Sequence, residues 1–307
     1  MNKILTITAN PAVDRVYFVE DFKIGEVHRP VKNVFSAGGK GINVSRVCKL
    51  LDADIIATGF LGGYMGDYIR SQLKNLDIND CFTQINGETR ICINISDKNG
   101  VSSEILEGGP IITAYEKERF IESFKERILD CEIITVSGSL PQGLNSDFYI
   151  TIADIAKEYN KRIIFDTSGK ALEDVIENKP FMVKPNKDEF LKLAGWSDFD
   201  PKRALMFLKD KGVEVPFVSL GKDGAVAIIN QKFYKFSVPT IDVVNTVGSG
   251  DSTIAGIAVG ISKGMSICDS IVLGMAAGVS NSLFETTGFV TKDTVKEFYK
   301  KIEVTCL

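Results

Sequence analysis

The chain has little of what zinc-based and histidine-based catalysis requires. Its 307 residues include a single histidine, His28, and six cysteines with no C-x-x-C pair among them. A clustered zinc site is therefore not expected, and a Ser-His-Asp or Cys-His mechanism would have to rest on His28, which has no nucleophile motif beside it. The cysteines indicate free thiols in a reducing cytosol. A carboxylate is the natural general base.

Long apolar runs and an excess of positive charge are also missing. No stretch approaches the roughly 18 uninterrupted apolar residues that span a membrane, and residues 3–11 indicate a strand and a turn rather than the core of a signal peptide. The net charge of −4 does not favour a nucleic-acid-binding surface, so a few placed cations would have to hold any phosphorylated ligand. We expect a cytoplasmic protein with no membrane and no nucleic-acid partner.

Two common nucleotide-binding motifs are absent. Lys40 and Lys222 follow glycines, but neither lies in a G-x-x-x-x-G-K-[ST] frame. The run at 245–253, NTVGSGDST, has Thr253 where the third glycine of G-x-G-x-x-G would stand, and it lies far from a first βα unit. A kinase with this sequence would not be a P-loop kinase. A nicotinamide-dependent enzyme is a weaker hypothesis than a kinase.

The run at 245–253 does contain an aspartate directly behind two glycines, at the predicted start of a helix. The glycines let the backbone approach a ligand, and the free N–H groups of a first helical turn point at negative charge. Asp251 can accept a proton from an attacking hydroxyl. Phosphoryl transfer requires these parts. The alternative is that Asp251 only caps the helix.

From about residue 130 onward the sequence is typical of a parallel sheet flanked by helices, because short apolar runs alternate with amphipathic segments of helical length. Each predicted strand ends in small or polar residues, and ligands bind beyond the carboxyl ends of such strands. Residues 225–230 and 232–237 indicate a hairpin at an antiparallel edge. The predicted strands before it are 133–136, 162–165, 181–183 and 217–218.

The first third of the chain predicts strands without intervening helices. In the segment 89–96, Arg90 and Cys92 fall on one face while Ile91 and Ile93 fall on the other. Such strands could form a small sheet whose polar face closes over a substrate and whose apolar face a second subunit covers. Alternatively, they are edge strands of the main sheet. The other candidate strands are 13–19, 27–35 and 103–106.

Two further clusters can bind polar ligands. The turn at 37–45, AGGKGINVS, leads into a predicted helix, so its backbone N–H groups can bind hydroxyls or phosphate together with Lys40 and Asn43. Asn186 and Glu189 lie three residues apart at the head of another predicted helix, where an amide and a carboxylate can organise Mg²⁺. A capping box fits the same two residues equally well.

Taken together, the glycine turn at 38–41, the Asn186-x-x-Glu189 pair and the run at 248–251 resemble the PfkB carbohydrate kinases of the ribokinase-like superfamily. The motifs fall in the family order over essentially the whole chain. Within the family, four segments resemble the branch that phosphorylates sugar phosphates, which comprises the tagatose-6-phosphate kinases and the 1-phosphofructokinases. These segments are 8–14, 87–92, 104–110 and 137–143.

The resemblance implies an α/β fold, a ribokinase-like three-layer α/β/α sandwich with a mostly parallel central sheet and a small β-sheet lid. The whole of 1–307 would be a single kinase domain, with lid strands inserted at about 12–36 and 86–108. ATP and Mg²⁺ would be the cofactors and a sugar phosphate the acceptor. A homodimer through the lid is expected.

The resemblance also implies a role for each site residue. Asp251 would deprotonate the sugar hydroxyl, and Arg90 would meet the phosphate already on the substrate, because a guanidinium can grip phosphate oxygens bidentately. Asn186 and Glu189 belong to the motif linked to Mg²⁺. The anion hole would be the backbone of Val247, Gly248, Ser249 and Gly250; the other sugar-site residues are Asp14, Gly38, Gly39, Lys40, Asn43, Ser139 and Arg29; the ATP site is Lys184, Asn186, Ser219, Gly221, Gly224, Val247, Gly250 and Asn281.

The motifs leave the acceptor open between tagatose 6-phosphate and, as the alternative, fructose 1-phosphate. The two sugar phosphates differ in the position of the phosphate and in one stereocentre. Segments 62–67, 88–92 and 248–253 resemble tagatose-6-phosphate kinases more closely. Segments 41–45 and 245–247 fit 1-phosphofructokinases equally well.

A hypothesis from another class is a non-catalytic sugar-phosphate sensor on the same fold. The intact set of Asp251, Asn186 and Glu189 stands against it, since a sensor does not need the base. Many relatives have alanine where Ser249 stands, a difference that leaves the backbone donors in place.

Overall fold

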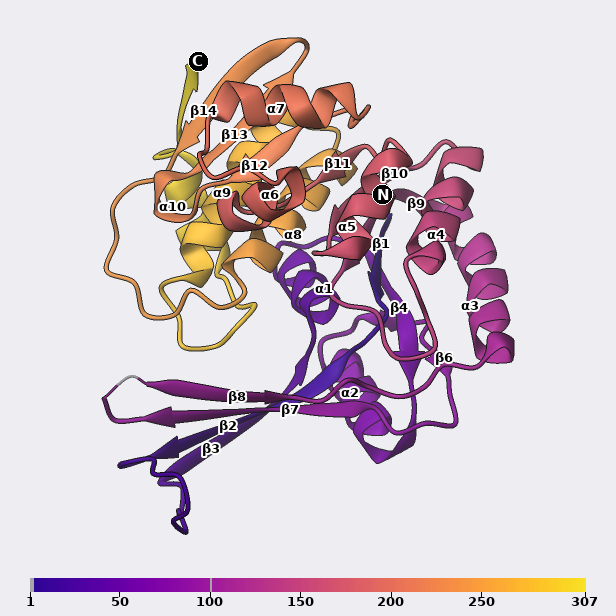
Figure 1. The fold of residues 1–307 in the computed structure, drawn as a ribbon, viewed down its shortest axis with the longest axis vertical. Helices are drawn as coiled ribbons and strands as arrows, with labels where there is room; N and C mark the ends of the chain where they lie inside the picture. The colour runs from indigo at the N-terminus through magenta and orange to yellow at the C-terminus, as the bar shows by residue number, and fades with distance from the viewer. Residues whose placement is uncertain (1–2, 100) are drawn as a thin grey trace.

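A computed structural model describes residues 3–99 and 101–307. A parallel central sheet carries helices on both faces, a second sheet lies beside the C-terminal helices, and a third extends away from the body (Figure 1). The predicted three-layer α/β/α architecture is confirmed, because the central sheet separates two hydrophobic cores, one on each of its faces.

The central sheet has the strand order β11-β10-β9-β1-β4-β5, with β6 paired to the end of β4, and every pair is parallel. Its middle strands are buried almost throughout, as expected where helices cover both faces. The strands predicted from 133, 162 and 181 are confirmed. The bounds are β1 Lys3–Thr8, β4 Ile55–Leu61, β5 Asn79–Asp80, β6 Thr83–Gln84, β9 Cys131–Ser137, β10 Arg162–Asp166 and β11 Met182–Val183.

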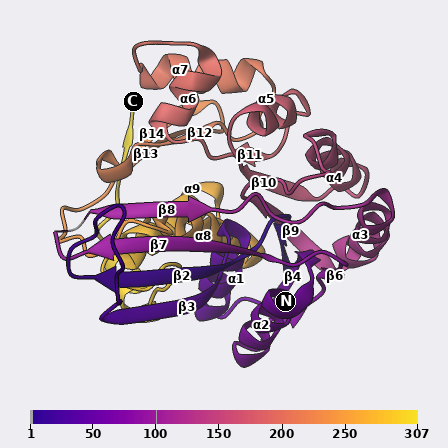
Figure 2. The same ribbon diagram turned by 60° about the horizontal axis from the view of Figure 1, so that its bottom comes forward.

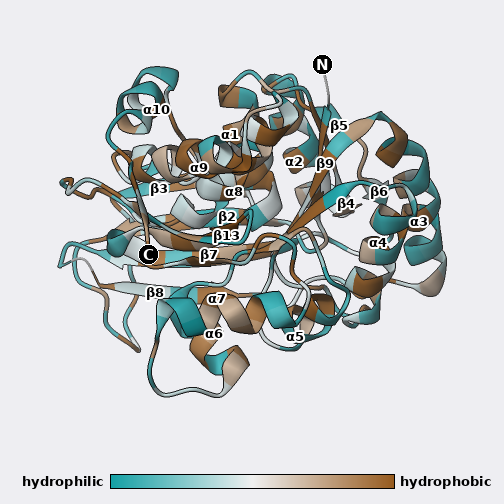
Figure 3. Cartoon of the chain, turned by 90° about the horizontal axis from the view of Figure 1, so that it is seen from above, coloured by the Kyte–Doolittle hydropathy of each residue, from teal (hydrophilic) through white to brown (hydrophobic). Residues whose placement is uncertain are grey.

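The helices bury apolar faces against the sheet and leave polar faces outside, and Figure 3 shows the hydrophobic residues concentrated in the strands and in the helices that cover them. One core contains side chains of α1 Lys40–Leu50, α2 Gly63–Asn75, α8 Ser249–Ser262, α9 Ile267–Asn281 and α10 Lys292–Tyr299. The other contains side chains of α3 Ala114–Arg127, α4 Asp147–Glu158, α5 Lys170–Glu177, α6 Lys187–Ala194 and α7 Pro201–Asp210, and the short 3-10 turns are Ile128–Asp130 and Gly221–Asp223.

The hairpin predicted after Gly224 is confirmed, but it belongs to a sheet of its own. Strands β12 Phe217–Ser219, β13 Ala225–Ile229, β14 Lys232–Ser237 and β15 Glu303–Cys306 are antiparallel throughout. The expectation that the strand at 217–218 extends the parallel sheet is therefore wrong. The chain turns back at once through Gly224, so β12 pairs with β13, and only isolated bridges such as Asn186 to Ser219 connect it to the end of β11.

Four strands from the first 106 residues form a separate sheet, which we call the lid sheet, while β1, β4, β5 and β6 of the same part of the chain belong to the central sheet. The lid sheet has the order β3-β2-β7-β8, in which β2 and β7 are parallel and the outer pairs antiparallel (Figures 1 and 2). These strands are not edge strands of the central sheet. The bounds are β2 Ala12–Val19, β3 Lys32–Gly38, β7 Arg90–Asp97 and β8 Ser102–Leu106. The expectation of strands without intervening helices is wrong, because α1 and α2 lie between β3 and β7.

One predicted lid strand is displaced. We expected a strand at 27–35, whereas β3 runs from Lys32 to Gly38. Pro30 has no N–H to donate to a neighbouring strand, and the residues before it form a largely exposed loop. The strand starts beyond the proline and continues to the glycine turn.

The topology places several polar strand ends at one edge. The carboxyl ends of parallel β1, β9 and β10 face the same way, and α1 and α8 begin near that edge and pack on one another. Within the described ranges, no helix has the length and apolar character needed to cross a membrane.

Candidate active site

The start of α8 presents free backbone donors. Gly248 caps the helix in the left-handed region, with φ of 83°. A Cβ there would lie 2.7 Å from a methyl carbon of Thr287 and 2.8 Å from the nitrogen of Gly288, so glycine is required. In the part of the chain that the structure describes, the N–H groups of Gly250 and Asp251 have no hydrogen-bond acceptor. Such donors at the positive end of a helix suit an anion.

Asp251 lies in the first turn of α8 and is buried, with 6% of its surface exposed. The alternative that it caps the helix is wrong, because the cap is the glycine three residues earlier. Its Oδ2 accepts a hydrogen bond from Nδ2 of Asn43 at 2.8 Å. Burial, and next the neighbouring charge of Asp166, raise the pKa of Asp251 to about 6. This carboxylate is ionised at neutral pH and is basic enough to take a hydroxyl proton.

Asp166 is a site residue that the sequence reasoning missed, since the pattern marks this position only as the polar residue after the predicted strand at 162–165. It is 2% exposed at the end of β10, where Oδ1 lies 3.3 Å from Nζ of Lys184 and Oδ2 lies 3.5 Å from Nζ of Lys40. Burial alone would raise its pKa, but the two ammonium groups hold the pKa below its ordinary value. An acidic residue ending a buried strand, beside another strand that ends in lysine, was the available signal.

The predicted sugar-site residues of the lid sheet and the glycine turn lie together. A Cβ on Gly38 would fall 2.0 Å from Oδ2 of Asp14, so this carboxylate lies directly against the turn. Gly39 caps α1 with φ of 100°. Burial raises the pKa of Asp14 to about 6, although Arg46 and Arg90 oppose it. The lid sheet thus brings a second titratable carboxylate to the same region as the start of α1.

Lys40 and Asn43 reach the site from α1. Lys40 is the first residue of this helix and pairs with Asp166, and Asn43 contacts the carboxylate of Asp251. Across from them, a Cβ on Gly138 would lie 3.9 Å from Cβ of Lys40, which places the loop after β9 beside the helix start. The exposed Ser139 follows in that loop.

Arg90 lies at the base of the lid sheet, and Arg29 does not. The guanidinium of Arg90 donates to the carbonyl oxygens of Glu107 at 2.9 Å and Asn10 at 3.0 Å, while its Nε has no partner among the described residues. Arg29 lies in the exposed loop between β2 and β3, beyond the residue that pairs with Phe18. That loop is roughly 13 Å along the strand from Asp14, so the structure does not bring Arg29 to the other site residues of its own chain.

The predicted ATP-site residues gather where β11 and β12 end. Asn186 and Ser219 form a parallel bridge, so the segments after Lys184 and at the end of β12 lie side by side. Gly221 adopts φ of 59°, and a Cβ on Gly224 would lie 1.8 Å from the carbonyl oxygen of Phe236. Both glycines therefore serve the tight turn after β12. Their contact with a nucleotide stays a prediction.

Val247 and Asn281 contribute in different ways. Val247 is 58% exposed next to the start of α8. Asn281 is fully buried; its Nδ2 donates to the carbonyl oxygen of Val247 at 2.9 Å, and its Oδ1 accepts from the N–H of Gly288 at 2.8 Å. The amide is satisfied within the protein and holds the loop before α8. Direct contact of Asn281 with ATP stays a prediction.

The capping box predicted as the alternative for Asn186 and Glu189 is confirmed. Each side chain accepts a hydrogen bond at 2.9 Å from the backbone N–H of the other, at the start of α6. The second carboxylate oxygen of Glu189 has no hydrogen-bond partner among the described residues. Mg²⁺ commonly binds one or two carboxylates together with waters and substrate phosphates, so the free oxygen fits such an ion. Residues 3–99 and 101–307 contain no group of three His, Cys, Asp or Glu side chains placed to hold a metal alone.

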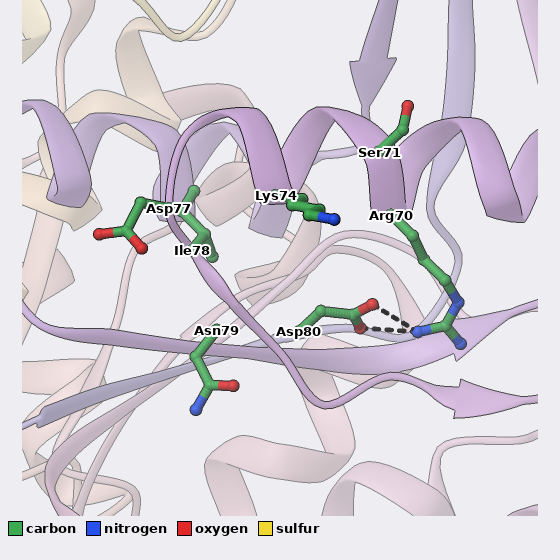
Figure 4. A pocket seen from close by; sticks show the side chains of 7 residues that line it. All are labelled: Arg70, Ser71, Lys74, Asp77, Ile78, Asn79 and Asp80. Atoms are coloured by element: carbon green, nitrogen blue, oxygen red, sulfur yellow. Dashed lines mark hydrogen bonds and ion pairs between the residues drawn. The ribbon is translucent and has the colours of Figure 1, made fainter.

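A cavity of ≈ 400 Å³ lies elsewhere, along the C-terminal part of α2 (Figure 4). In its lining, the guanidinium of Arg70 donates hydrogen bonds to both carboxylate oxygens of Asp80, at 2.8 and 2.6 Å. None of the predicted site residues lines it, so the candidate site is defined by its side chains and not by this hollow. The lining residues are Arg70, Ser71, Lys74, Asp77, Ile78, Asn79 and Asp80.

Known proteins are similar to this chain over its whole length. A tagatose-6-phosphate kinase of Staphylococcus epidermidis is 41% identical over 307 residues, which cover 98% of this chain and 99% of that protein. The solved structure of phosphofructokinase-2 from Escherichia coli in complex with potassium has a TM-score of 0.90 at 25% identity and covers 98% of this chain and 99% of that one. A Thermotoga maritima protein described as a possible 1-phosphofructokinase has a TM-score of 0.86 at 27% identity, with 100% of both chains covered. Residues 2–281 match the family model described as pfkB family carbohydrate kinase. The chain belongs to the pfkB family of carbohydrate kinases.

Proposed function

We propose that this carbohydrate kinase transfers the γ-phosphoryl group of ATP to tagatose 6-phosphate and releases tagatose 1,6-bisphosphate and ADP. The observation that carries the reaction type is the buried Asp251, with its pKa raised to about 6, beside free backbone donors at the start of α8. The 41% identity to the tagatose-6-phosphate kinase of S. epidermidis supports the choice of acceptor.

In this proposal Asp251 takes the proton of the acceptor hydroxyl as its oxygen attacks the γ-phosphorus of ATP. The bond from that phosphorus to the β-γ bridging oxygen breaks, and ADP leaves. The N–H groups of Gly250 and Asp251 stabilise the charge on the transferring group. Lys40 and Lys184, both held by Asp166, supply positive charge on the same side. Mg²⁺ bound by Glu189 would neutralise charge on the nucleotide phosphates when present.

Arg90 would bind the phosphate that the acceptor already carries, so Arg90→Met is expected to raise the KM for the sugar phosphate about 10- to 100-fold, the scale of one or two charge-assisted hydrogen bonds. The kcat should change less. Steady-state kinetics with varied sugar phosphate at saturating ATP measure both. Arg70→Met is the matched control, because Arg70 also pairs through its guanidinium but lies at the cavity along α2. An unchanged KM in Arg90→Met would remove Arg90 from the acceptor site.

The acceptor is decided by ADP release measured with tagatose 6-phosphate, fructose 1-phosphate, fructose 6-phosphate and the free sugars. The highest kcat/KM is expected with tagatose 6-phosphate. The T. maritima neighbour favours fructose 1-phosphate as the second candidate, and a higher kcat/KM with that sugar would establish it. Turnover of free sugars alone would refute a sugar-phosphate kinase. Tight binding of a sugar phosphate with no turnover would make the protein a sensor.

We also propose a homodimer through the outer face of the lid sheet. The strand register sets Phe35, Arg15, Ile93 and Ile105 in one row across the sheet, on the face opposite to that of Asp14. Phe35 is 43% exposed and Ile105 57% exposed, and the Arg15 guanidinium lies over the Phe35 ring, 4.7 Å from its centroid. A largely apolar exposed row of this kind marks an interface.

Sedimentation at micromolar concentration is expected to give twice the mass of the chain. Ile105→Glu should shift the protein to the monomer, because it would bury a charge in the proposed interface. Leu129→Glu, at an equally exposed leucine near the end of α3, should remain dimeric. A monomeric wild type would refute this proposal.

A further inference from the structure

Arg46 joins three separate parts of the structure, and none of the roles above uses it. It lies on α1 three residues after Asn43, so both side chains share one face of the helix. Its Nη1 donates to Oδ1 of Asn43 at 3.1 Å and to the carbonyl oxygen of Thr287 at 3.0 Å, and its Nη2 donates to the carbonyl oxygen of Ala37 at 2.5 Å. A half-buried guanidinium with three such acceptors is held in one place.

The contact with Asn43 determines which way that amide faces. A guanidinium only donates hydrogen bonds, so the side-chain oxygen of Asn43 must face Arg46 and the NH₂ group must face the other way. The NH₂ group then donates to Oδ2 of Asp251 at 2.8 Å. The reversed amide would set its oxygen against the carboxylate. Oδ1 of Asp251 has no partner within the described residues, and this leaves it for the proton of an acceptor hydroxyl.

The other two contacts of Arg46 lead to the lid sheet and to the loop before α8. Ala37 lies at the end of β3, where the lid sheet joins the glycine turn. Thr287 precedes Gly288, whose N–H donates to Asn281, and the Asn281 amide holds the loop that precedes α8. A Cβ on Gly288 would lie 2.9 Å from Cβ of Asn43 and 3.1 Å from Nη1 of Arg46, so this loop packs directly on the pair.

We propose that Arg46 is a positioning residue for the kinase reaction: it orients the Asn43 amide, which in turn holds one oxygen of Asp251 and aims the other at the acceptor. Because Arg46 needs the carbonyl groups of Ala37 and Thr287, this orientation depends on the base of the lid sheet and the loop at Gly288 being in place. The inference rests on the proposed function, in which Asp251 is the base.

The kinetic test compares Arg46→Met and Arg46→Lys with Arg70→Met as the matched arginine control. We expect Arg46→Met to lower kcat about 10- to 100-fold with the KM for ATP nearly unchanged, the signature of a lost transition-state interaction. Arg46→Lys should recover part of kcat, because an ammonium can still donate to Asn43. Arg70→Met should keep the wild-type kcat. A wild-type kcat in Arg46→Met, or an equal loss in Arg70→Met, would overturn the inference.

A second readout needs no substrate. In the wild type, the side-chain ¹H–¹⁵N signals of Asn43, assigned with Asn43→Ser, should shift as Asp251 titrates near pH 6. In Arg46→Met that pH-linked shift should be lost, whereas Arg70→Met should retain it. The other charges around Asp251, those of Asp166, Lys40 and Lys184, are the same in every variant. The charge of Arg46, which acts on both Asp251 and Asp14, is lost in Arg46→Met and kept in Arg46→Lys. An unchanged shift in Arg46→Met contradicts the inference.

The two readouts separate this inference from the proposed function. A wild type that phosphorylates no sugar phosphate would refute the function, and the Asn43 signals would still test Arg46. If Arg46→Met does not fold, Arg46→Lys carries both measurements, because a single ammonium replaces the two nitrogens that contact Asn43, Thr287 and Ala37. We expect a reduced kcat and a reduced pH-linked shift of the Asn43 signals in Arg46→Lys, and wild-type values for both would overturn the inference.

Discussion

Asp251→Asn is expected to lower kcat at least about 100-fold, the usual scale for the loss of a general base. The asparagine has the same shape and can still accept the hydrogen bond of Asn43, but it cannot take a proton from the acceptor. The KM for ATP should remain near that of the wild type, because the backbone donors of α8 are unchanged. Steady-state ADP release at pH 7.5, with both substrates varied, measures the effect.

The matched control is Asp269→Asn. Asp269 lies in the first turn of α9, as Asp251 does in α8, but it accepts a hydrogen bond from the helix cap Ser266 and lies outside the site. This variant should retain the wild-type kcat. Near-normal turnover by Asp251→Asn would leave Asp251 with only a structural role and would remove the central support for the proposed mechanism.

The same substitution is expected to stabilise the protein, by an amount that depends on pH. The pKa of Asp251 in the folded protein is about 6, above the ordinary 3.8. Folding therefore favours the protonated carboxyl of Asp251. The stability that this group contributes is fully present below the unfolded pKa and is lost as the pH rises through about 6. Asp251→Asn should raise the free energy of unfolding at pH 8, by at most about 3 kcal/mol, and by less at pH 5. Urea unfolding at both values measures this, and a loss of stability at pH 8 would contradict it.

Asp166→Asn is expected to lower the free energy of unfolding by about 3 kcal/mol at pH 7, because it leaves Lys184 buried without its anion. Lys184 is 6% exposed, whereas the side chain of Lys40 is 43% exposed, so Lys184 determines most of the cost. The turnover should also fall, since both lysines lose their anchor beside Asp251. Urea unfolding and ADP release on the same preparation measure the two effects.

The matched control for stability is Asp174→Asn, which breaks an exposed ion pair with Lys170 at 2.6 Å. It should leave stability nearly unchanged, as exposed pairs contribute little. The pKa of Asp166 is held below its ordinary value, so its contribution is present above the unfolded pKa and is lost as the pH falls through the folded pKa. The difference between Asp166→Asn and the wild type should therefore shrink below about pH 4. Equal stability of the two proteins at pH 7 would show that the buried pair is not a net stabilising feature.

Much of the fold could be predicted because local patterns determine it. Apolar runs ending in polar residues predicted β9 and β10, and the period-two alternation at 89–96 predicted a strand of the lid sheet. The prediction failed where pairing depended on distant segments. The pairing of β12 with β13, and the strand β15 from the C-terminal residues, are set by contacts that no local pattern encodes. The start of β3 was misplaced because an alternating pattern extends through Pro30, which cannot pair as a strand residue would.

The sequence by itself determined the chemistry that can occur at the start of α8. Glycines beside an aspartate at a helix start give free backbone donors and a candidate base wherever they stand, because backbone freedom and helix polarity are local properties. Only the tertiary structure decided how that aspartate behaves. Its contact with Asn43 spans 208 positions, and that of Lys40 with Asp166 spans 126. The pKa of a carboxylate and the direction in which it points depend on burial and on charges supplied by distant segments, and these exist only once the chain has folded.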